Sequence, residues 1–165
     1  MVTVREACEA DIPALRRMAE AAFPTAYALI LSKAQIAYMM RMMYSEESLH
    51  RQFAVEKQRF FIAEDDGREV GYASVERQGE TLFHLQKIYV LPSAQGSGVG
   101  SALFDRIVEE VRLMQPSACR LELNVNRHNK AVGFYLRKGM RQVRSGDFPI
   151  GDGYYMNDYI MSLDL

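Results

Sequence analysis

The glycine-rich stretch Gln95–Gly100, which reads QGSGVG, constrains this chain more than any other feature. It stands between a predicted strand, 83–90, and a predicted helix that runs to residue 114. Apolar residues line one side of that helix at helical spacing, namely Val99, Leu103, Ile107, Val111 and Met114. Glycines let the backbone turn tightly and leave N–H groups unobstructed, and the positive end of the helix points at them. The stretch therefore predicts a cradle for the phosphates of a ligand, with a plain turn of the chain as the alternative.

Two common phosphate-binding loops do not fit this stretch. A Walker loop ends in Gly-Lys-Ser/Thr, whereas Gly100 is followed by Ser101 and an alanine. A Rossmann loop needs its third glycine one position later, where Ser101 stands, and an acid at the tip of the next strand. Glu122, the candidate for that acid, lies in the middle of a predicted strand. The spacing therefore excludes both loop types.

The spacing that does fit is Q/R-x-x-G-x-G/A, carried by Gln95, Gly98 and Gly100. With this pattern the sequence resembles the GNAT superfamily of acyl-CoA-dependent N-acetyltransferases. Two further stretches carry the resemblance, 85–92 (LQKIYVLP) before the glycines and 123–140 (LNVNRHNKAVGFYLRKGM) after them. A closer resemblance, to bacterial polyamine N-acetyltransferases of the PAI/spermidine type, rests on the short stretches Phe60–Ala63, Lys87–Val90 and Asn157–Met161.

The order of predicted elements is that of an α/β protein with a mixed sheet. Strands are predicted at 2–5, 60–64, 69–76, 83–90, 119–125, 140–144 and 155–163, and helices at 12–23, within 25–57, from the glycines to 114 and at 129–138. Pro24 is expected to end the first helix, and Ser145–Gly153 to form a loop rich in glycine and proline. We expect the α+β GNAT fold as a single domain over 1–165, with a mostly antiparallel sheet, parallel pairing at its centre and helices on both faces.

Composition excludes several classes of partner. The 165 residues carry 20 Lys+Arg against 21 Asp+Glu, a net charge of −1, so the basic excess of a protein that binds nucleic acid or anionic membrane is absent. Two cysteines and three scattered histidines predict neither a disulfide framework nor a metal site. No apolar run is long enough to span a bilayer and no secretion signal is recognisable, so a cytoplasmic protein is expected.

The resemblance implies acetyl-CoA as the co-substrate, with its pyrophosphate on the N–H groups of Gln95–Gly100. It also implies that the main chain of Ile88 and Val90 pairs with the pantetheine arm, and that one N–H there faces the thioester carbonyl. The implied cofactor-binding residues are Ile88, Tyr89, Val90, Gln95, Gly96, Ser97, Gly98, Val99, Gly100, Ser101, Asn129 and Tyr135. For Asn129 a second interpretation, a helix N-cap, stays open.

The resemblance also singles out Tyr135 as the acid that protonates the departing thiolate. A positioned phenol can act in this way, because free thiols titrate near pH 8.5 and phenols near pH 10. An aromatic residue on a helix face, without a chemical role, is the alternative. Many relatives place a glutamate on the strand before the glycines as the general base; here alternation puts His84 and Gln86 on the same face as Ile88 and Val90. Only His84 can take a proton, and an ordinary sheet histidine is the alternative to catalysis.

The expected reaction is direct transfer of acetyl from acetyl-CoA to a primary amine of a small molecule, with a polyamine as one candidate and no metal required. Acceptor specificity is expected from residues 25–57, where Met and Tyr cluster, although such a stripe is also typical of a core or a homodimer face. The segment 145–153 is a second candidate for the acceptor wall or for dimer contacts. Three alternatives remain: a protein or peptide amine as acceptor, a non-catalytic acyl-CoA-binding module, and a nucleotide-phosphate site unrelated to CoA.

Overall fold

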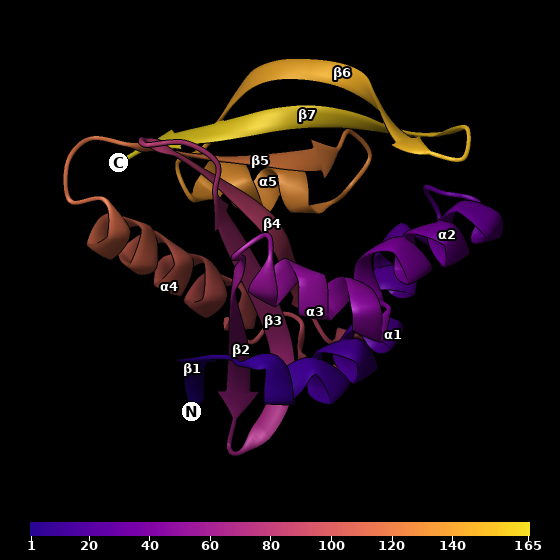
Figure 1. Cartoon of the computed structure of the whole chain (residues 1–165), viewed down its shortest axis with the longest axis horizontal. Helices are drawn as coiled ribbons and strands as arrows, with labels where there is room; N and C mark the ends of the chain where they lie inside the picture. The colour runs from indigo at the N-terminus through magenta and orange to yellow at the C-terminus, as the bar shows by residue number, and fades with distance from the viewer.

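Seven strands form one sheet in the order β1-β2-β3-β4-β5-β7-β6, and five α-helices pack against it (Figure 1). The computed structural model describes residues 1–165. The strands are β1 (Val2–Glu6), β2 (Arg59–Asp65), β3 (Arg68–Arg77), β4 (Leu82–Val90), β5 (Arg120–Asn126), β6 (Arg141–Gly151) and β7 (Tyr154–Asp164). The helices are α1 (Ile12–Tyr27), α2 (Lys33–Tyr44), α3 (Glu46–Ala54), α4 (Val99–Met114) and α5 (Ala131–Arg137). Two 3₁₀ turns, η1 (Glu9–Asp11) and η2 (Pro92–Ala94), precede α1 and α4.

The antiparallel meander β2-β3-β4 forms where the sequence predicts it. Asp66 and Gly67 have φ of 49° and 82° and turn β2 into β3, a conformation that glycine adopts without strain. Only β4 and β5 pair in parallel, and every other pair of neighbours is antiparallel. The predicted fold class, a mostly antiparallel mixed sheet with parallel pairing at its centre, is confirmed.

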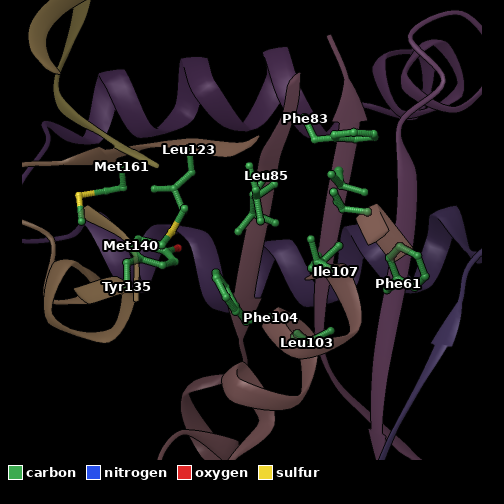
Figure 2. Packing of buried hydrophobic residues seen from close by; sticks show 14 of the residues in the cluster. Phe61, Phe83, Leu85, Leu103, Phe104, Ile107, Leu123, Tyr135, Met140 and Met161 are labelled. Carbon is green, nitrogen blue, oxygen red and sulfur yellow. The ribbon is translucent and has the colours of Figure 1, made fainter. Parts of the chain in front are cut away.

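The sheet separates two hydrophobic cores, because β2 and β3 bury side chains on both faces. On one face α4 covers a core that includes Phe83, Leu103 and Ile107, which Figure 2 shows packed between the helix and the strands. On the other face α1, α2 and α3 cover a second core around Phe23 and Leu49. The strand β4 therefore runs between the layer of α4 and the layer of α1–α3.

The first helix is longer than the sequence predicts. It continues through Pro24 and ends at Tyr27. A proline this close to the end of a helix removes a single N–H hydrogen bond, and the Thr25 hydroxyl donates to the carbonyl of Ala21 at 3.1 Å within the same turn. The prediction that Pro24 ends the helix is therefore wrong.

The predicted loop Ser145–Gly153 is mostly strand. It extends β6 as far as Gly151, and the chain then turns at Asp152 and Gly153 into β7. The strand β6 lies at the edge of the sheet, and its register against β7 shifts beside Pro149. Proline has no N–H to donate, but no further strand lies on the outer side of β6 to accept from one.

The irregular helical region 25–57 resolves into the end of α1 followed by α2 and α3. Serine side chains cap both of these helices: Ser32 Oγ accepts from the Gln35 amide at 3.1 Å, and Ser45 Oγ from the amide at position 48 at 3.2 Å. In the methionine cluster, Met39 is buried in the second core, so that side chain serves packing. None of the helices has the length and apolar character that crossing a membrane requires.

Candidate functional site

The glycine stretch lies between η2 and α4, with its backbone open to solvent. Gly96 and Gly98 have φ of 83° and 84°, a conformation that favours glycine, and Gly98 is the N-cap of α4. A Cβ atom at either glycine would meet nothing within 4 Å. The Ala102 amide is the first in α4 with a backbone acceptor, the Gly98 carbonyl at 3.0 Å. The amides of residues 95–101 have no acceptor in the protein and can bind an anion.

The strands β4 and β5 diverge beside this stretch. They pair only over Leu82–His84 and Arg120–Glu122, and Figure 1 shows β4 and β5 running in different directions beyond these residues. From Leu85 onward, the edge of β4 that faces β5 therefore has no strand partner. An extended ligand can pair with such an edge as an added strand does. Because η2 and the glycines follow β4 directly, one ligand can occupy both places.

A β-bulge in β4 changes which side chains share a face. The register against β3 shifts by one residue, so that Gln86 has no residue opposite it. Ile88 and Val90 consequently pack against the core that α4 covers. His84 lies on the opposite face, where its Nε2 atom is 3.0 Å from Oδ1 of Asn124. The prediction that His84 and Gln86 share a face with Ile88 and Val90 is wrong, because strict alternation takes no account of a bulge.

Tyr135 is the buried side chain of α5, with 6% of its surface exposed. Its ring lies 6.4 Å from that of Phe104 and 5.4 Å from that of Phe134, centroid to centroid. Figure 2 shows Tyr135 at the end of this core, close to Met140. Burial raises the pKa of Tyr135, and the neighbouring Tyr27 adds to the effect. The phenol therefore holds its proton at neutral pH.

Tyr27, in the last turn of α1, brings a second phenol to the same place. Its hydroxyl lies 3.4 Å from the hydroxyl of Tyr89 on β4. Burial raises the pKa of Tyr27, while the hydrogen bond with Tyr89 lowers it. The charge of Asp158, on β7, also raises that pKa. The sequence analysis missed Tyr27, since the helix was expected to end before it.

The other residues predicted to bind the cofactor have different contacts in the structure. Asn129 Oδ1 accepts from the Ala131 amide at 2.8 Å, so its side-chain oxygen caps the start of α5. The side chain of Val99 is buried in the core, which leaves its amide for a ligand. The Ser97 hydroxyl donates to the Ala94 carbonyl and holds the loop, and the Ser101 hydroxyl accepts from Lys138, the residue after α5.

His84 is one end of a polar chain that crosses three strands. Asn124 Oδ1 accepts from His84 Nε2 at 3.0 Å, and Asn124 Nδ2 donates to Asp158 Oδ2 at 3.3 Å. Burial lowers the pKa of His84. Burial also raises the pKa of Asp158, although the Asn124 bond opposes this. The sequence analysis did not assign roles to Asn124 and Asp158. The only sign of a role in the sequence was that each is a polar residue within a largely buried strand.

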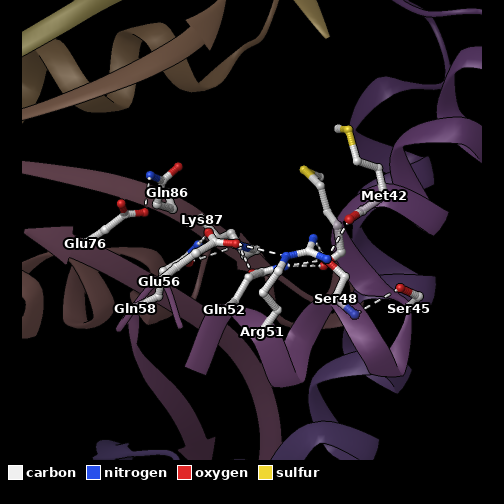
Figure 3. Close-up of polar contacts among 11 residues, drawn as sticks. Met42, Ser45, Ser48, Arg51, Gln52, Glu56, Gln58, Glu76, Gln86 and Lys87 are labelled. Atoms are coloured by element: carbon white, nitrogen blue, oxygen red, sulfur yellow. Dashed lines mark hydrogen bonds and ion pairs between the residues drawn. The ribbon is translucent and has the colours of Figure 1, made fainter. Parts of the chain in front are cut away.

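Lys87 is a buried cation that faces α3 (Figure 3). Its Nζ atom donates to Gln52 Oε1 of α3 at 2.5 Å and to Gln58 Oε1 at 3.1 Å, and it lies 5.2 Å from the centroid of the Phe60 ring. Burial lowers the pKa of Lys87 to about 8. No carboxylate forms an ion pair with it, so the two amide oxygens carry its hydrogen bonds and tie α3 to β4.

The β6–β7 hairpin is bonded to α2 across the same side of the sheet. Tyr38 donates to the Ile150 carbonyl at 2.7 Å, and Gln35 Nε2 donates to the Tyr155 carbonyl at 2.8 Å. The ring of Tyr38 also packs on that of Tyr154, with centroids 5.3 Å apart. These contacts bring the two predicted acceptor walls, residues 25–57 and 145–153, against each other.

Comparison with known families agrees with this geometry. The model of the acetyltransferase (GNAT) domain matches residues 29–161. The chain belongs to the GNAT acetyltransferases. It is therefore an acyltransferase with acetyl-CoA as its acetyl donor, as the sequence resemblance implied.

Relatives of this GNAT protein cover nearly the whole chain. An uncharacterized N-acetyltransferase of Mycobacterium tuberculosis is 28% identical over 156 residues, which are 94% of this chain and 98% of the relative. Among solved structures, the PaiA N-acetyltransferase of Thermoplasma acidophilum in complex with coenzyme A has a TM-score of 0.81 and 21% identity, and covers 100% of this chain and 99% of that one. The ribosomal-protein-S18-alanine N-acetyltransferase of Escherichia coli has a TM-score of 0.73 and 20% identity over 99% and 94% of the two chains. These structures share the fold.

Proposed function

We propose that this enzyme moves the acetyl group of acetyl-CoA directly to a primary amine of a small molecule. The observation that carries the proposal is the continuity of the free amides of 95–101 with the unpaired edge of β4, beside the buried phenol of Tyr135. The amides suit a diphosphate, the strand edge suits an extended pantetheine arm, and the phenol suits a thiolate that needs a proton.

In this proposal the main chain holds most of the donor. The amides of Gln95–Gly100 bind the diphosphate, with the positive end of α4 behind them. The main chain of Ile88 and Val90 pairs with the arm, and one N–H there donates to the thioester carbonyl as negative charge develops on its oxygen. Asn129 contributes through Nδ2, because its Oδ1 atom already caps α5.

Two protons move in the proposed reaction. The acceptor's ammonium loses the first proton, and the polar chain that contains His84 takes part in removing it. The amine nitrogen then forms a bond to the thioester carbon, and the C–S bond breaks with its electron pair on sulfur. Tyr135 gives its hydroxyl proton to that sulfur and regains a proton from the N–H that the new amide loses. One proton is released for each acetyl group transferred.

We propose a small acceptor because the hydrogen bonds of Tyr38 and Gln35 join α2 to the β6–β7 hairpin. A protein segment would have to part these two elements, whereas a thin aliphatic amine would not. A polyamine is our specific candidate, since the buried carboxylate of Asp158 on this side suits a cationic chain.

The test is thiol release from acetyl-CoA with a panel of acceptors: spermidine, putrescine, an aminoglycoside and a peptide with a free N-terminus. Turnover with spermidine or putrescine at least about tenfold above that with the peptide is expected. Faster turnover of the peptide would refute a small-molecule acceptor. Thermal stabilisation by CoA without turnover of any amine would instead indicate a binding module.

A further inference from the structure

A chain of three polar side chains runs across β4, β5 and β7 on the face away from α4. His84 Nε2 is 3.0 Å from Asn124 Oδ1, and Asn124 Nδ2 is 3.3 Å from Asp158 Oδ2. The register explains this contact, because Asp158 lies opposite Asn126, two residues along β5 from Asn124 and on the same face. Three residues that lie 40 and 34 positions apart in sequence are thus joined by two hydrogen bonds.

Both ends of the chain have an atom without a partner. Asp158 is only 5% exposed, yet its Oδ1 atom accepts no hydrogen bond, and neither does the buried Nδ1 atom of His84 donate or accept one. A buried polar atom left unpaired costs about 1–3 kcal/mol, more when the group is charged. Such a cost at two ends of one network is typical of a site that completes its bonds when a substrate arrives.

The charged groups around this chain are largely engaged elsewhere. The guanidinium of Arg127, which faces Asp158, is bonded to Asp147 at 2.5 Å. Glu122, beside His84, is bonded by Arg144 at 3.1 Å, and the remaining neighbours of His84 are Glu76 and Gln86, which bond to each other at 3.1 Å. No cation pairs with Glu76 or Asp158, but Glu76 accepts from Gln86 whereas Asp158 Oδ1 is buried and accepts no hydrogen bond.

Asp158 also lies at the reaction side of the chain. Its charge raises the pKa of Tyr27, whose hydroxyl lies 3.4 Å from that of Tyr89 on β4. Met156, two residues before Asp158 on the same face of β7, contacts Gln35 of α2 through its sulfur at 3.6 Å. Asp158 thus lies on the face of the sheet that α1 and α2 cover.

We propose that Asp158 is the catalytic base of the acetyl transfer: its Oδ1 atom binds the acceptor's ammonium and takes its proton, while Asn124 and His84 position the carboxylate. This inference rests on the proposed function and identifies the group that the acceptor meets. In the step, an N–H bond of the ammonium breaks, an O–H bond forms on Asp158, and the freed electron pair on nitrogen attacks the thioester carbon. The proton later leaves Asp158 to solvent.

The decisive variant is Asp158→Asn, which keeps the size of the side chain and removes its basicity. With spermidine at pH 7 we expect kcat/KM to fall about 100-fold or more. With 2,2,2-trifluoroethylamine, whose amine is largely unprotonated at pH 7, we expect kcat/KM within about threefold of the parent enzyme, because no proton has to be removed before attack. Equal losses with both amines would overturn the assignment of Asp158 as the base.

The matched control is Asp164→Asn, on the same strand β7. It also removes a carboxylate, one that bonds Arg141 and is largely exposed, and should leave kcat/KM with spermidine within about twofold. The positioning role of His84 is tested by His84→Gln, which should lower kcat with spermidine about tenfold and leave KM for acetyl-CoA unchanged. An unchanged kcat in His84→Gln would show that the histidine does not position Asp158.

A second measurement needs no acceptor and therefore separates this inference from the proposed function. The side-chain carboxyl carbon of Asp158, followed by NMR as pH changes, should titrate above the ordinary aspartate value of about 3.9. In Asn124→Ala the titration should move higher still, because the bond that favours the carboxylate is lost. If no amine is acetylated, the proposed function fails, and an ordinary titration of Asp158 independently overturns the inference.

Discussion

Replacement of Lys87 by methionine isolates the free energy of one buried cation that joins α3 to β4. The side chain of Lys87 is 6% exposed and has amide oxygens as its hydrogen-bond acceptors. Its pKa falls from 10.5 to about 8 because burial disfavours the charged form. At about 1.4 kcal/mol per pH unit, this difference makes the ammonium destabilise the folded state by about 3 kcal/mol at pH 7.

The sign of the pH dependence follows from the direction of the shift. Between pH 8 and 10.5 the unfolded chain binds a proton at Lys87 that the folded protein has released, so the free energy of unfolding rises with pH. Below pH 8 both states hold the proton and the full destabilisation is present. From pH 7 to pH 10 the parent protein should therefore gain about 2–3 kcal/mol relative to Lys87→Met.

Urea unfolding at pH 7, 8, 9 and 10 measures this difference. Other titrating groups, including the tyrosines of the second core, are common to both proteins and cancel in the comparison. In Lys87→Met, Gln52 Oε1 loses its hydrogen-bond donor. This loss lowers the free energy of unfolding by an amount that does not change with pH. Lys33→Met, which removes an exposed lysine of α2, is the control and should give a curve parallel to the parent. Parallel curves for Lys87→Met would show that the buried lysine titrates normally and refute the reasoning.

Three further predictions concern the donor and acceptor sides. Tyr135→Phe should lower kcat at least about tenfold and leave the affinity for CoA within about twofold, measured by thiol release and calorimetry, whereas exposed Tyr155→Phe should change neither. Gly98→Asp should abolish the thermal stabilisation by CoA, because a carboxylate would stand in the anion cradle; Gly67→Asp, with nearly the same φ and equally open surroundings, should keep it. Tyr38→Phe removes the bond to the β6–β7 hairpin and should cost about 1 kcal/mol of stability in urea; an increase in stability would contradict that bond.

Some features of the donor side were determined by short stretches of sequence. The glycines at 96 and 98 do adopt left-handed conformations, and the helix after them buries the predicted apolar side, including Leu103 and Ile107. The meander also follows its pattern, with Gly67 at its turn. Each of these features depends on residues within a few positions of one another, so backbone preference and hydrophobic periodicity suffice to predict them.

The acceptor side was decided by the tertiary structure. The bulge at Gln86 arises from the pairing of β4 with β3, and it moves Ile88 and Val90 to the face opposite His84. No local pattern encodes such a shift, because one inserted residue reverses the alternation that the sequence otherwise predicts.

The positions of Tyr27, Asn124 and Asp158 depend on contacts between distant segments. Tyr27 reaches the site only because α1 continues past its proline and packs over β4, and Asp158 meets Asn124 only through the register of β7 on β5. The sequence alone therefore predicted the place that we propose for the acetyl donor, since that place is one continuous loop and strand edge. Long-range packing determined which side chains line the side that we propose for the amine, because they come from elements that only the folded sheet brings together.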